Sequence, residues 1–125
     1  MNAHVIEISI MFMSGLYDGE VKVFSSQDPH DGIYDEHKRW ILRIGRKTDG
    51  NDLVIEQDAT ISRTHACLTY HDGQWYLQDN GSRNGTFLDS PTLLEGQQVK
   101  ETPVPIQVGE LFKIGRTWLR IQAES

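Results

Sequence analysis

Residues that could hold a phosphate group are concentrated in the middle third of the chain. They form three short groups, at 45–46 (Gly-Arg), 62–65 (Ser-Arg-Thr-His) and 80–86 (Asn-Gly-Ser-Arg-Asn-Gly-Thr). Guanidinium groups and hydroxyls donate strong hydrogen bonds to phosphate oxygens, and glycines let a loop backbone approach a ligand closely. Together these residue types predict a phosphate-recognising module.

A phosphorylated side chain needs several charge-assisted donors around its oxygens and an anchor for its peptide backbone. Arg46 directly follows a glycine at a predicted strand end, and Ser62 and Arg63 are adjacent in an irregular stretch. A hydroxyl and two guanidinium groups could therefore converge. Asn84 can both donate and accept through its side-chain amide, which suits contact with a peptide backbone.

These groups lie at or near the ends of apolar runs that are typical of β-strands. The runs alternate or carry β-branched residues, with turn signals between them. No window has a sustained helical period, so we predict an all-β sandwich or barrel with the binding groups on its loops. The expected strands cover residues 4–13, 21–24, 39–45, 53–55, 65–70, 75–78, 86–88, 98–101, 110–114 and 117–121.

Two segments interrupt this strand pattern. Residues 25–37 read as a polar, acidic loop with little to bury. The stretch Thr102-Pro103-Val104-Pro105 cannot be an inner strand, because proline has no amide donor for a neighbouring strand.

The charge pattern allows a local positive field on an acidic protein. The net charge is −6, which argues against a nucleic-acid-binding domain. Residues 38–48 nevertheless contain five bases and no acid, whereas residues 18–36 contain six acids and one base. An anionic ligand would therefore meet a few placed charges and not a basic surface.

Length and composition favour one globular domain, since the chain has 125 residues and no low-complexity tract. The single cysteine, Cys67, excludes an intrachain disulfide and fits a reducing compartment. No targeting segment is evident, and no apolar run approaches the ~20 residues of a spanning helix. We therefore expect a cytoplasmic protein with no membrane insertion.

The order and spacing of the polar motifs resemble those of the forkhead-associated (FHA) domain. That family has Gly-Arg, then Ser-Arg/Asn-x-His, then Asp-x-Gly-Ser-x-Asn-Gly-Thr, which correspond here to residues 45–46, 62–65 and 79–86. Its Asn-Asp pair and its closing Gly-x-x-Phe/Ile-x-Ile-Gly pattern correspond to residues 51–52 and 109–115. The whole chain, 1–125, is interpreted as a single FHA domain with a core motif region at 39–122 and an acidic loop insertion at 25–37.

The resemblance implies an FHA/SMAD-like β-sandwich of about eleven strands that binds phosphothreonine peptides through loops at one end. It implies that Arg46 and Ser62 bind the phosphate, that Arg63 adds a donor, that Arg83 lies beside the phosphate and that Asn84 holds the peptide backbone. It assigns a loop-structuring role to three further residues, Gly45, His65 and Gly85.

The expected function is therefore that of a phosphoprotein-binding module in Ser/Thr kinase signalling. The expected partner is a protein or peptide that contains phosphothreonine, and no cofactor, metal or nucleic acid is expected. Where the family usually has Asn-Gly after its Asn-Gly-Thr strand, this chain has Asp89-Ser90-Pro91, so that turn departs from the pattern. The 25–37 loop is also longer than usual, and near the binding end its acids would repel a second phosphate.

Three alternatives stay open at this point. Ser62, His65 and Asp79 have the residue types of a hydrolase triad, but no nucleophile elbow surrounds the serine. An FHA-like scaffold that assembles proteins without binding phosphate is the second alternative. The third, a metal site without a recognisable ligand repeat, would use the acids and histidines of one loop, Asp28, His30, Asp31, Asp35, Glu36 and His37.

Overall fold

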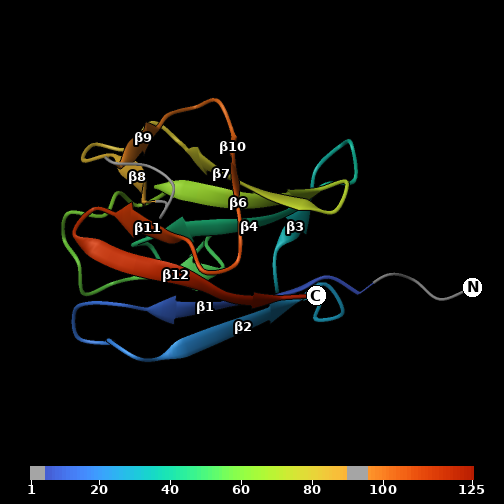
Figure 1. Cartoon of the computed structure of the whole chain (residues 1–125), viewed down its shortest axis with the longest axis horizontal. Helices are drawn as coiled ribbons and strands as arrows, with labels where there is room; N and C mark the ends of the chain where they lie inside the picture. Colours follow the sequence, from blue (N-terminus) through green and yellow to red (C-terminus); the bar gives the residue numbers. More distant parts are fainter. Residues whose placement is uncertain (1–4, 90–95) are drawn as a thin grey trace, which may run out of the picture.

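The computed structural model describes residues 5–89 and 96–125, which form two β-sheets packed against each other around one core (Figure 1). The strands found in these two ranges are β1 (Glu7–Phe12), β2 (Val21–Ser25), β3 (Ile33–Tyr34), β4 (Trp40–Gly45), β5 (Leu53–Val54), β6 (Ala66–His71), β7 (Gln74–Asp79), β8 (Thr86–Asp89), β9 (Gln97–Val99), β10 (Val104–Ile106), β11 (Leu111–Ile114) and β12 (Thr117–Glu124).

The first sheet has the strand order β2-β1-β12-β11-β8-β9, and the second has the order β10-β7-β6-β4-β3. β5 pairs in parallel with β4, whereas the other pairs are antiparallel. The prediction of an all-β sandwich is confirmed, with twelve strands in the described residues instead of about eleven. The part of the chain that the structure describes contains no helix long and apolar enough to cross a membrane.

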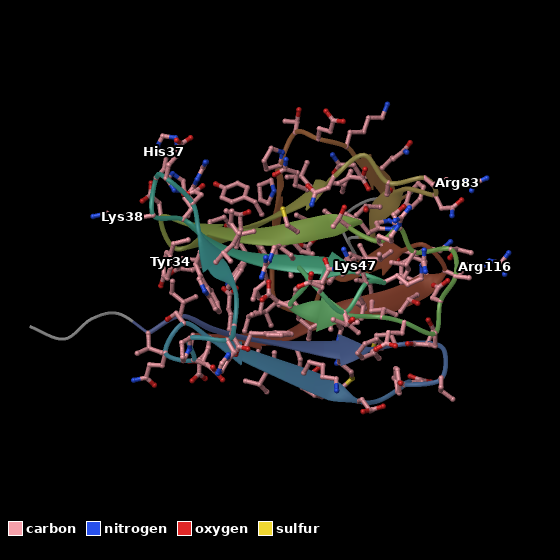
Figure 2. The ribbon with its side chains drawn as sticks, turned by 180° about the vertical axis from the view of Figure 1, so that it is seen from behind. Tyr34, His37, Lys38, Lys47, Arg83 and Arg116 are labelled. Carbon is pink, nitrogen blue, oxygen red and sulfur yellow. The ribbon has the colours of Figure 1, made fainter. Side chains whose placement is uncertain are left out.

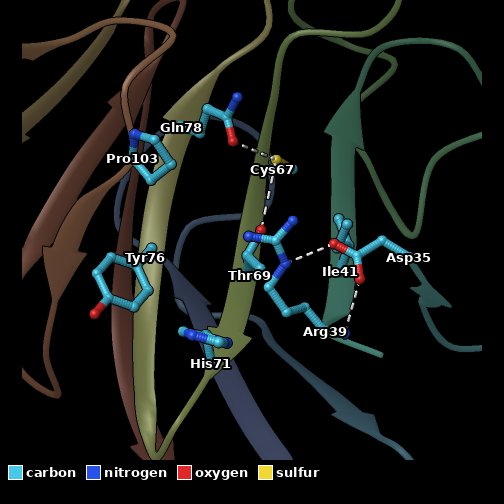
Figure 3. A pocket seen from close by; sticks show the side chains of 9 residues that line it. All are labelled: Asp35, Arg39, Ile41, Cys67, Thr69, His71, Tyr76, Gln78 and Pro103. Atoms are coloured by element: carbon cyan, nitrogen blue, oxygen red, sulfur yellow. Dashed lines mark hydrogen bonds and ion pairs between the residues drawn. The ribbon is translucent and has the colours of Figure 1, made fainter. Parts of the chain in front are cut away.

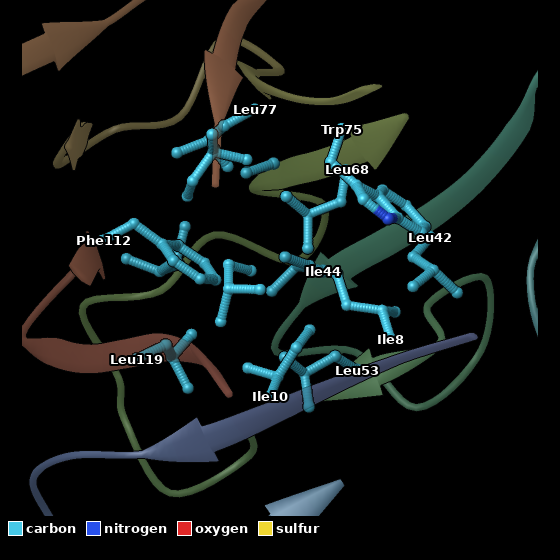
Figure 4. Packing of buried hydrophobic residues seen from close by; sticks show 14 of the residues in the cluster. Ile8, Ile10, Leu42, Ile44, Leu53, Leu68, Trp75, Leu77, Phe112 and Leu119 are labelled. Carbon is cyan, nitrogen blue, oxygen red and sulfur yellow. The ribbon is translucent and has the colours of Figure 1, made fainter. Parts of the chain in front are cut away.

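Alternation along the strands puts one face of each sheet into the shared core. In β4, the side chains of Trp40, Leu42 and Ile44 are buried, while the residues between them are partly exposed. The rings of Trp40 and Trp75 meet edge to face across 5.8 Å. Figure 4 shows how side chains from both sheets meet there, among them Ile8, Ile10, Leu42, Ile44, Leu53, Leu68, Trp75, Leu77, Phe112 and Leu119. Such a core gives the loops at the strand ends a rigid base.

Each predicted strand run overlaps an observed strand, but β3 and β10 were not predicted as strands. β3 lies inside the segment 25–37, so that segment is not all loop. Two hydrogen bonds fix the segment 25–37 to the rest of the protein. Trp40 Nε1 donates to the Asp31 carbonyl at 3.1 Å, and Gly32 N donates to Asp52 Oδ1 at 2.7 Å. Neither contact is visible in the local sequence pattern.

β10 contains Pro105 and lies at the edge of the second sheet, where β7 is its one partner among the described strands. An edge strand leaves one side of its backbone unpaired, so a proline there removes no inner hydrogen bond. The expectation that this stretch is not an inner strand is therefore met. The departure from the family pattern at Asp89-Ser90-Pro91 falls partly on Ser90 and Pro91, which lie outside the described residues.

The acidic segment and the arginine-bearing loops lie at opposite ends of the sandwich. Figure 2 shows Tyr34, His37 and Lys38 at one end and Arg83 and Arg116 at the other. The acids of the 25–37 segment therefore do not face the predicted binding loops, and the expected repulsion of a second phosphate does not arise.

Candidate anion-binding site

Five side chains singled out from the sequence line one hollow at the end of the sandwich where Figure 2 shows Arg83. The hollow is also lined by Ala59, Thr60 and Ile61. Its walls come from three loops, which follow β4, precede β6 and connect β7 to β8. No carboxylate belongs to the described residues that line it. The predicted residues that the structure brings together here are Arg46, Ser62, Arg63, Arg83 and Asn84.

Arg46 is fixed against the loop that carries Ser62. Its backbone amide donates to the Ser62 carbonyl at 3.1 Å, and its Nε donates to the Ile61 carbonyl at 2.9 Å. The two Nη atoms at the end of the guanidinium group take no part in these bonds. The side chain is therefore held at its Nε while its terminal donors are available to an anion.

The loop that carries Arg83 and Asn84 is hydrogen-bonded to the loop that carries Thr60 and Ser62. Ser62 Oγ accepts from the Arg83 backbone amide at 3.0 Å, so the hydroxyl hydrogen of Ser62 remains available to donate. Asn84 Nδ2 donates to the Thr60 carbonyl at 2.7 Å, which leaves Asn84 Oδ1 to accept from a ligand. These two bonds pre-form the hollow before any ligand arrives.

His65 lies beneath the hollow, fully buried, and connects two of its loops. Its Nδ1 accepts from the Ser62 backbone amide at 3.0 Å, so the proton of the neutral ring sits on Nε2. Nε2 then donates to the Gly85 carbonyl at 2.8 Å. Burial lowers the pKa of His65, and this outweighs the opposite effects of the Gly85 carbonyl, Asp79 and Asp58. The imidazole is therefore neutral at pH 7.

The lowered pKa of His65 predicts a loss of stability as the pH falls. The unfolded chain takes up a proton on this histidine near its ordinary pKa of about 6.5, whereas the folded protein binds it only at lower pH. Stability is therefore complete above about pH 6.5 and decreases below it, by at most about 1.4 kcal/mol per pH unit. Chemical denaturation between about pH 7.5 and 5.5 measures this decrease.

The matched variant is His65→Gln, which keeps a polar side chain but cannot be protonated. Its free energy of unfolding should change less than that of the wild type over the same pH range. The range stays above the region where the carboxylates titrate, near pH 4. An equal pH dependence in the variant would show that another group is responsible.

Asp79 organises the turn that presents Arg83. Its Oδ2 accepts from the backbone amides of Gly81 and Ser82 at 2.9 Å, and its Oδ1 accepts from the hydroxyls of Ser82 and Thr86. Burial acts to raise the pKa of Asp79, but the hydrogen bonds from Ser82 and Thr86 hold it below its usual value. The residue therefore stays a carboxylate and keeps the turn closed. The spacing Asp79 to Ser82 is a recognisable turn signal.

Gly45 allows the loops to approach each other closely. A Cβ atom at this position would overlap the Arg63 carbonyl oxygen and lie 2.7 Å from Asn51 Nδ2. Asn51 in turn donates to the carbonyls of Lys47 and Arg63, at 2.8 and 2.7 Å. This glycine and asparagine together fix the loop 62–65 beside the loop that begins at Arg46. Gly85 has a φ of +89°, which a glycine adopts easily.

Thr60 and Asp58 are site residues that the sequence interpretation missed. The carbonyl of Thr60 receives the bond from Asn84, and its amide donates to Asp58 Oδ1 at 2.9 Å. Asp58 Oδ2 also accepts from the Arg116 amide at 3.0 Å and from the Thr117 hydroxyl at 2.7 Å. The Asp-Ala-Thr sequence at 58–60 was the available signal, since aspartate often bonds the backbone two residues on.

The arginines that line the hollow differ from Arg39 and Arg43, which each pair with an aspartate. Arg39 is 2.6 Å from Asp35, and Arg43 is 3.1 Å from Asp52. In residues 5–89 and 96–125, the guanidinium groups that line the hollow have no acidic partner. Three positive charges without a counter-charge therefore face the same space on a protein of net charge −6. Such an arrangement attracts an anion.

The contacts do not form a hydrolytic triad. His65 Nδ1 bonds the backbone amide of Ser62 and not its hydroxyl, which accepts from Arg83 N instead. The other ring nitrogen faces the Gly85 carbonyl and is 4.0 Å from Asp79 Oδ1. Among the described residues, His65 is therefore not placed to act as a general base for the Ser62 hydroxyl.

The acids considered as metal ligands contact the protein itself. Asp31 Oδ2 accepts from the Ser25 amide at 3.1 Å, Asp35 pairs with Arg39, and Asp28 accepts from the His30 amide at 2.9 Å. Within the described ranges, no group of three or more His, Cys, Asp or Glu side chains is placed to hold a metal ion.

The fold and the motif-bearing loops define the class of protein: the chain belongs to the FHA-domain family, whose family model matches residues 42–115. An FHA domain-containing protein of Arabidopsis thaliana is 39% identical over 74 residues, covering 59% of this chain and 18% of the relative. FhaB of Mycobacterium tuberculosis strain H37Rv is 34% identical over 79 residues, covering 63% of this chain and 45% of FhaB. The predicted family is confirmed.

A probable E3 ubiquitin-protein ligase, dma1 of Schizosaccharomyces pombe, is 34% identical over 79 residues, covering 59% of this chain and 29% of the ligase. The chain thus spans less than half the length of these relatives. The family model that matches residues 42–115 describes the FHA domain, which is itself non-catalytic.

Solved structures show the same fold. The solution structure of an FHA domain from a hypothetical protein of Arabidopsis thaliana superposes with a TM-score of 0.69 at 28% identity, covering 92% of this chain and 82% of that one. An engineered FHA domain with a Myc-pTBD peptide has a TM-score of 0.70 at 20% identity, with 93% and 90% covered. These superpositions extend over nearly the whole sandwich.

Proposed function

We propose that this domain binds phosphothreonine in partner proteins and acts downstream of a Ser/Thr kinase. The observation that carries the proposal is the hollow in which three guanidinium groups and the Ser62 hydroxyl converge. In the part of the chain that the structure describes, these guanidinium groups have no acidic partner and no carboxylate lines the hollow. FHA domains typically bind phosphothreonine peptides, and one structural neighbour comes from a study of phosphothreonine-dependent FHA domain interactions. The chemistry of the hollow agrees with that family property.

The contacts within the hollow suggest a role for each of its polar side chains. A phosphothreonine carries close to two negative charges, and its oxygens accept several hydrogen bonds. The Nη atoms of Arg46, the guanidinium of Arg63 and the hydroxyl of Ser62 are the proposed donors to those oxygens. Arg83 lies beside them, and Asn84 Oδ1 is the proposed acceptor for a backbone amide of the peptide, because its Nδ2 already bonds Thr60.

The expected affinity is micromolar. Three to five charge-assisted hydrogen bonds contribute about 1.5–3 kcal/mol each, and association and peptide ordering offset much of this sum. A net free energy of about −8 kcal/mol corresponds to a Kd near 1 μM. A preference for phosphothreonine over phosphoserine depends on contact with one methyl group, which is worth roughly 1–3 kcal/mol.

A peptide array tests the proposed function. The array carries degenerate peptides with a central phosphothreonine, phosphoserine or unmodified threonine. We expect retention on phosphothreonine, weaker retention on phosphoserine and none on threonine. Equal retention on phosphorylated and unmodified peptides would instead support the alternative of a phospho-independent assembly scaffold.

The proposed place of action is the cytoplasm. This part of the proposal is supported by the single cysteine, Cys67, which is buried in β6 as a free thiol and needs no oxidising compartment. Cell fractionation with an antibody against the whole protein checks it, and recovery from an oxidising compartment would contradict it.

A further inference from the structure

The outer face of the second sheet carries a row of uncharged side chains across its five consecutive strands. The register pairs Ile33 with Ile41, Ile41 with Thr69, Thr69 with Tyr76 and Tyr76 with Pro105. All five are at least partly exposed, because the row faces away from the core. Ile33 is 42% exposed. We call these five residues the outer row.

A trough of about 240 Å³ lies over the middle of the outer row and is lined there by Ile41, Thr69 and Tyr76 (Figure 3). Sites for drug-sized molecules usually enclose about 300–1,000 Å³ and bury most of the ligand. This trough is smaller and open along a sheet, so it suits one or two side chains of an extended peptide.

The lining of the trough favours an apolar side chain. The carboxylate of Asp35 and the guanidinium of Arg39, which both line the trough, neutralise each other at 2.6 Å. His71 also lines it, and its Nε2 lies 3.3 Å from Asp72 Oδ2. Burial raises the pKa of Cys67, which keeps its thiol uncharged. The trough therefore offers no net charge to a ligand, in contrast to the arginines of the anion hollow. Burial of aliphatic or aromatic surface is the interaction that it can supply.

One end of the trough approaches the turn that forms one wall of the anion hollow. Cys67 Sγ contacts Asn80 Oδ1 at 3.9 Å, and Asn80 begins the turn that carries Arg83 and Asn84. Thr69 follows Arg63 by six residues, which at ~3.3 Å per residue limits the distance between the outer row and the hollow to roughly 20 Å. An extended ligand covers that distance with about six residues of its own.

We propose that the trough binds an aliphatic or aromatic side chain of the same phosphorylated partner, about six residues from its phosphothreonine. This inference rests on the proposed function. The partner's phosphate occupies the hollow, its chain runs extended over β6 and β7, and its apolar side chain packs on the outer row. The domain thereby selects partners by a second feature that short phosphopeptides lack.

The test compares two peptide libraries that share a fixed phosphothreonine. One is random over about three positions on either side and the other over about ten, so that at ~3.3 Å per residue only the second reaches the outer row. We expect the long library to show enrichment of Leu, Ile, Val or Phe about six positions from the phosphothreonine, on one side. The best long peptide should bind about tenfold more tightly than its truncated form.

Thr69→Glu is the diagnostic variant, because it puts a carboxylate in the centre of the outer row. It should remove the tenfold advantage of the long peptide and leave binding of the short one unchanged. Ser9→Glu is the matched control, since Ser9 also lies outward in a strand, on the other sheet, and it should behave like the wild type.

Three outcomes would overturn the inference: no apolar enrichment in the long library, an enrichment that persists in Thr69→Glu, or equal binding of long peptides without phosphate. A dimer in sedimentation that Thr69→Glu dissociates would also overturn it, because a second copy would then occupy the trough. Each of these outcomes leaves binding of short phosphothreonine peptides intact. Failure of the proposed function gives a different result. In that case, neither library would bind more tightly with its phosphate than without it.

Discussion

The variant Arg46→Ala is expected to weaken binding of a phosphothreonine peptide at least 100-fold, with the fold intact. Arg46 is the arginine of the hollow whose Nε is fixed, at 2.9 Å from the Ile61 carbonyl, so its terminal donors are already oriented. Removing two charge-assisted hydrogen bonds of about 1.5–3 kcal/mol each exceeds the 2.7 kcal/mol that corresponds to 100-fold. Fluorescence anisotropy with the best peptide of the array measures the change.

Three further variants show whether the effect belongs to the hollow. Arg46→Lys keeps the charge but loses the planar guanidinium, so partial binding should remain. Asn84→Ala removes a proposed backbone contact and should weaken binding by about tenfold. Arg120→Ala removes an arginine that bonds Gln122 outside the hollow and should change nothing. If a folded Arg46→Ala protein kept wild-type affinity, the hollow would not be the phosphate-binding site.

The variant Gly45→Ala is expected to destabilise the fold by about 2–3 kcal/mol and to lower the Tm by roughly 10 °C. The added Cβ overlaps the carbonyl oxygen of Arg63, which is backbone and cannot rotate away. The loop 62–65 must then move away from β4, so peptide binding should fall as well. Thermal unfolding by circular dichroism measures the stability, and anisotropy measures the binding.

Gly96→Ala is the matched control for this effect. A Cβ atom there would lie 3.5 Å from the Leu88 carbonyl oxygen, which is an ordinary contact. Its Tm should stay close to that of the wild type. If both variants melted alike, steric contact at Gly45 would not be the reason why a glycine occupies that position.

Most of the longer strands were predictable because their residues alternate. β4 and β7 each have six residues that alternate between buried and partly exposed positions, so the sequence period identified them. β3 has two residues, both exposed, and carries no such period. β10 carries a proline that argues against a strand, and only its position at the edge of the sheet makes it compatible.

The residues of the hollow were predictable because three motifs keep their order and spacing along the chain. What connects those motifs was not predictable, since the contacts join residues far apart in sequence. Asp58 bonds Arg116 and Thr117, which follow it by 58 and 59 positions. Asn84 and Thr60, which bond each other, are 24 positions apart. The local sequence pattern around each residue does not indicate such long-range pairs.

The hydrogen bonds that join the loops, from Arg83 to Ser62 and from Asn84 to Thr60, have a kinetic consequence. A hollow formed in advance requires no slow rearrangement, so association at ~10⁵–10⁷ M⁻¹s⁻¹ is expected. Combined with a Kd near 1 μM, this gives dissociation at roughly 0.1–10 s⁻¹. A bound phosphothreonine is then released within seconds. Between release and rebinding it is accessible to a phosphatase. Occupancy of the domain would accordingly follow the balance of kinase and phosphatase activity almost without delay.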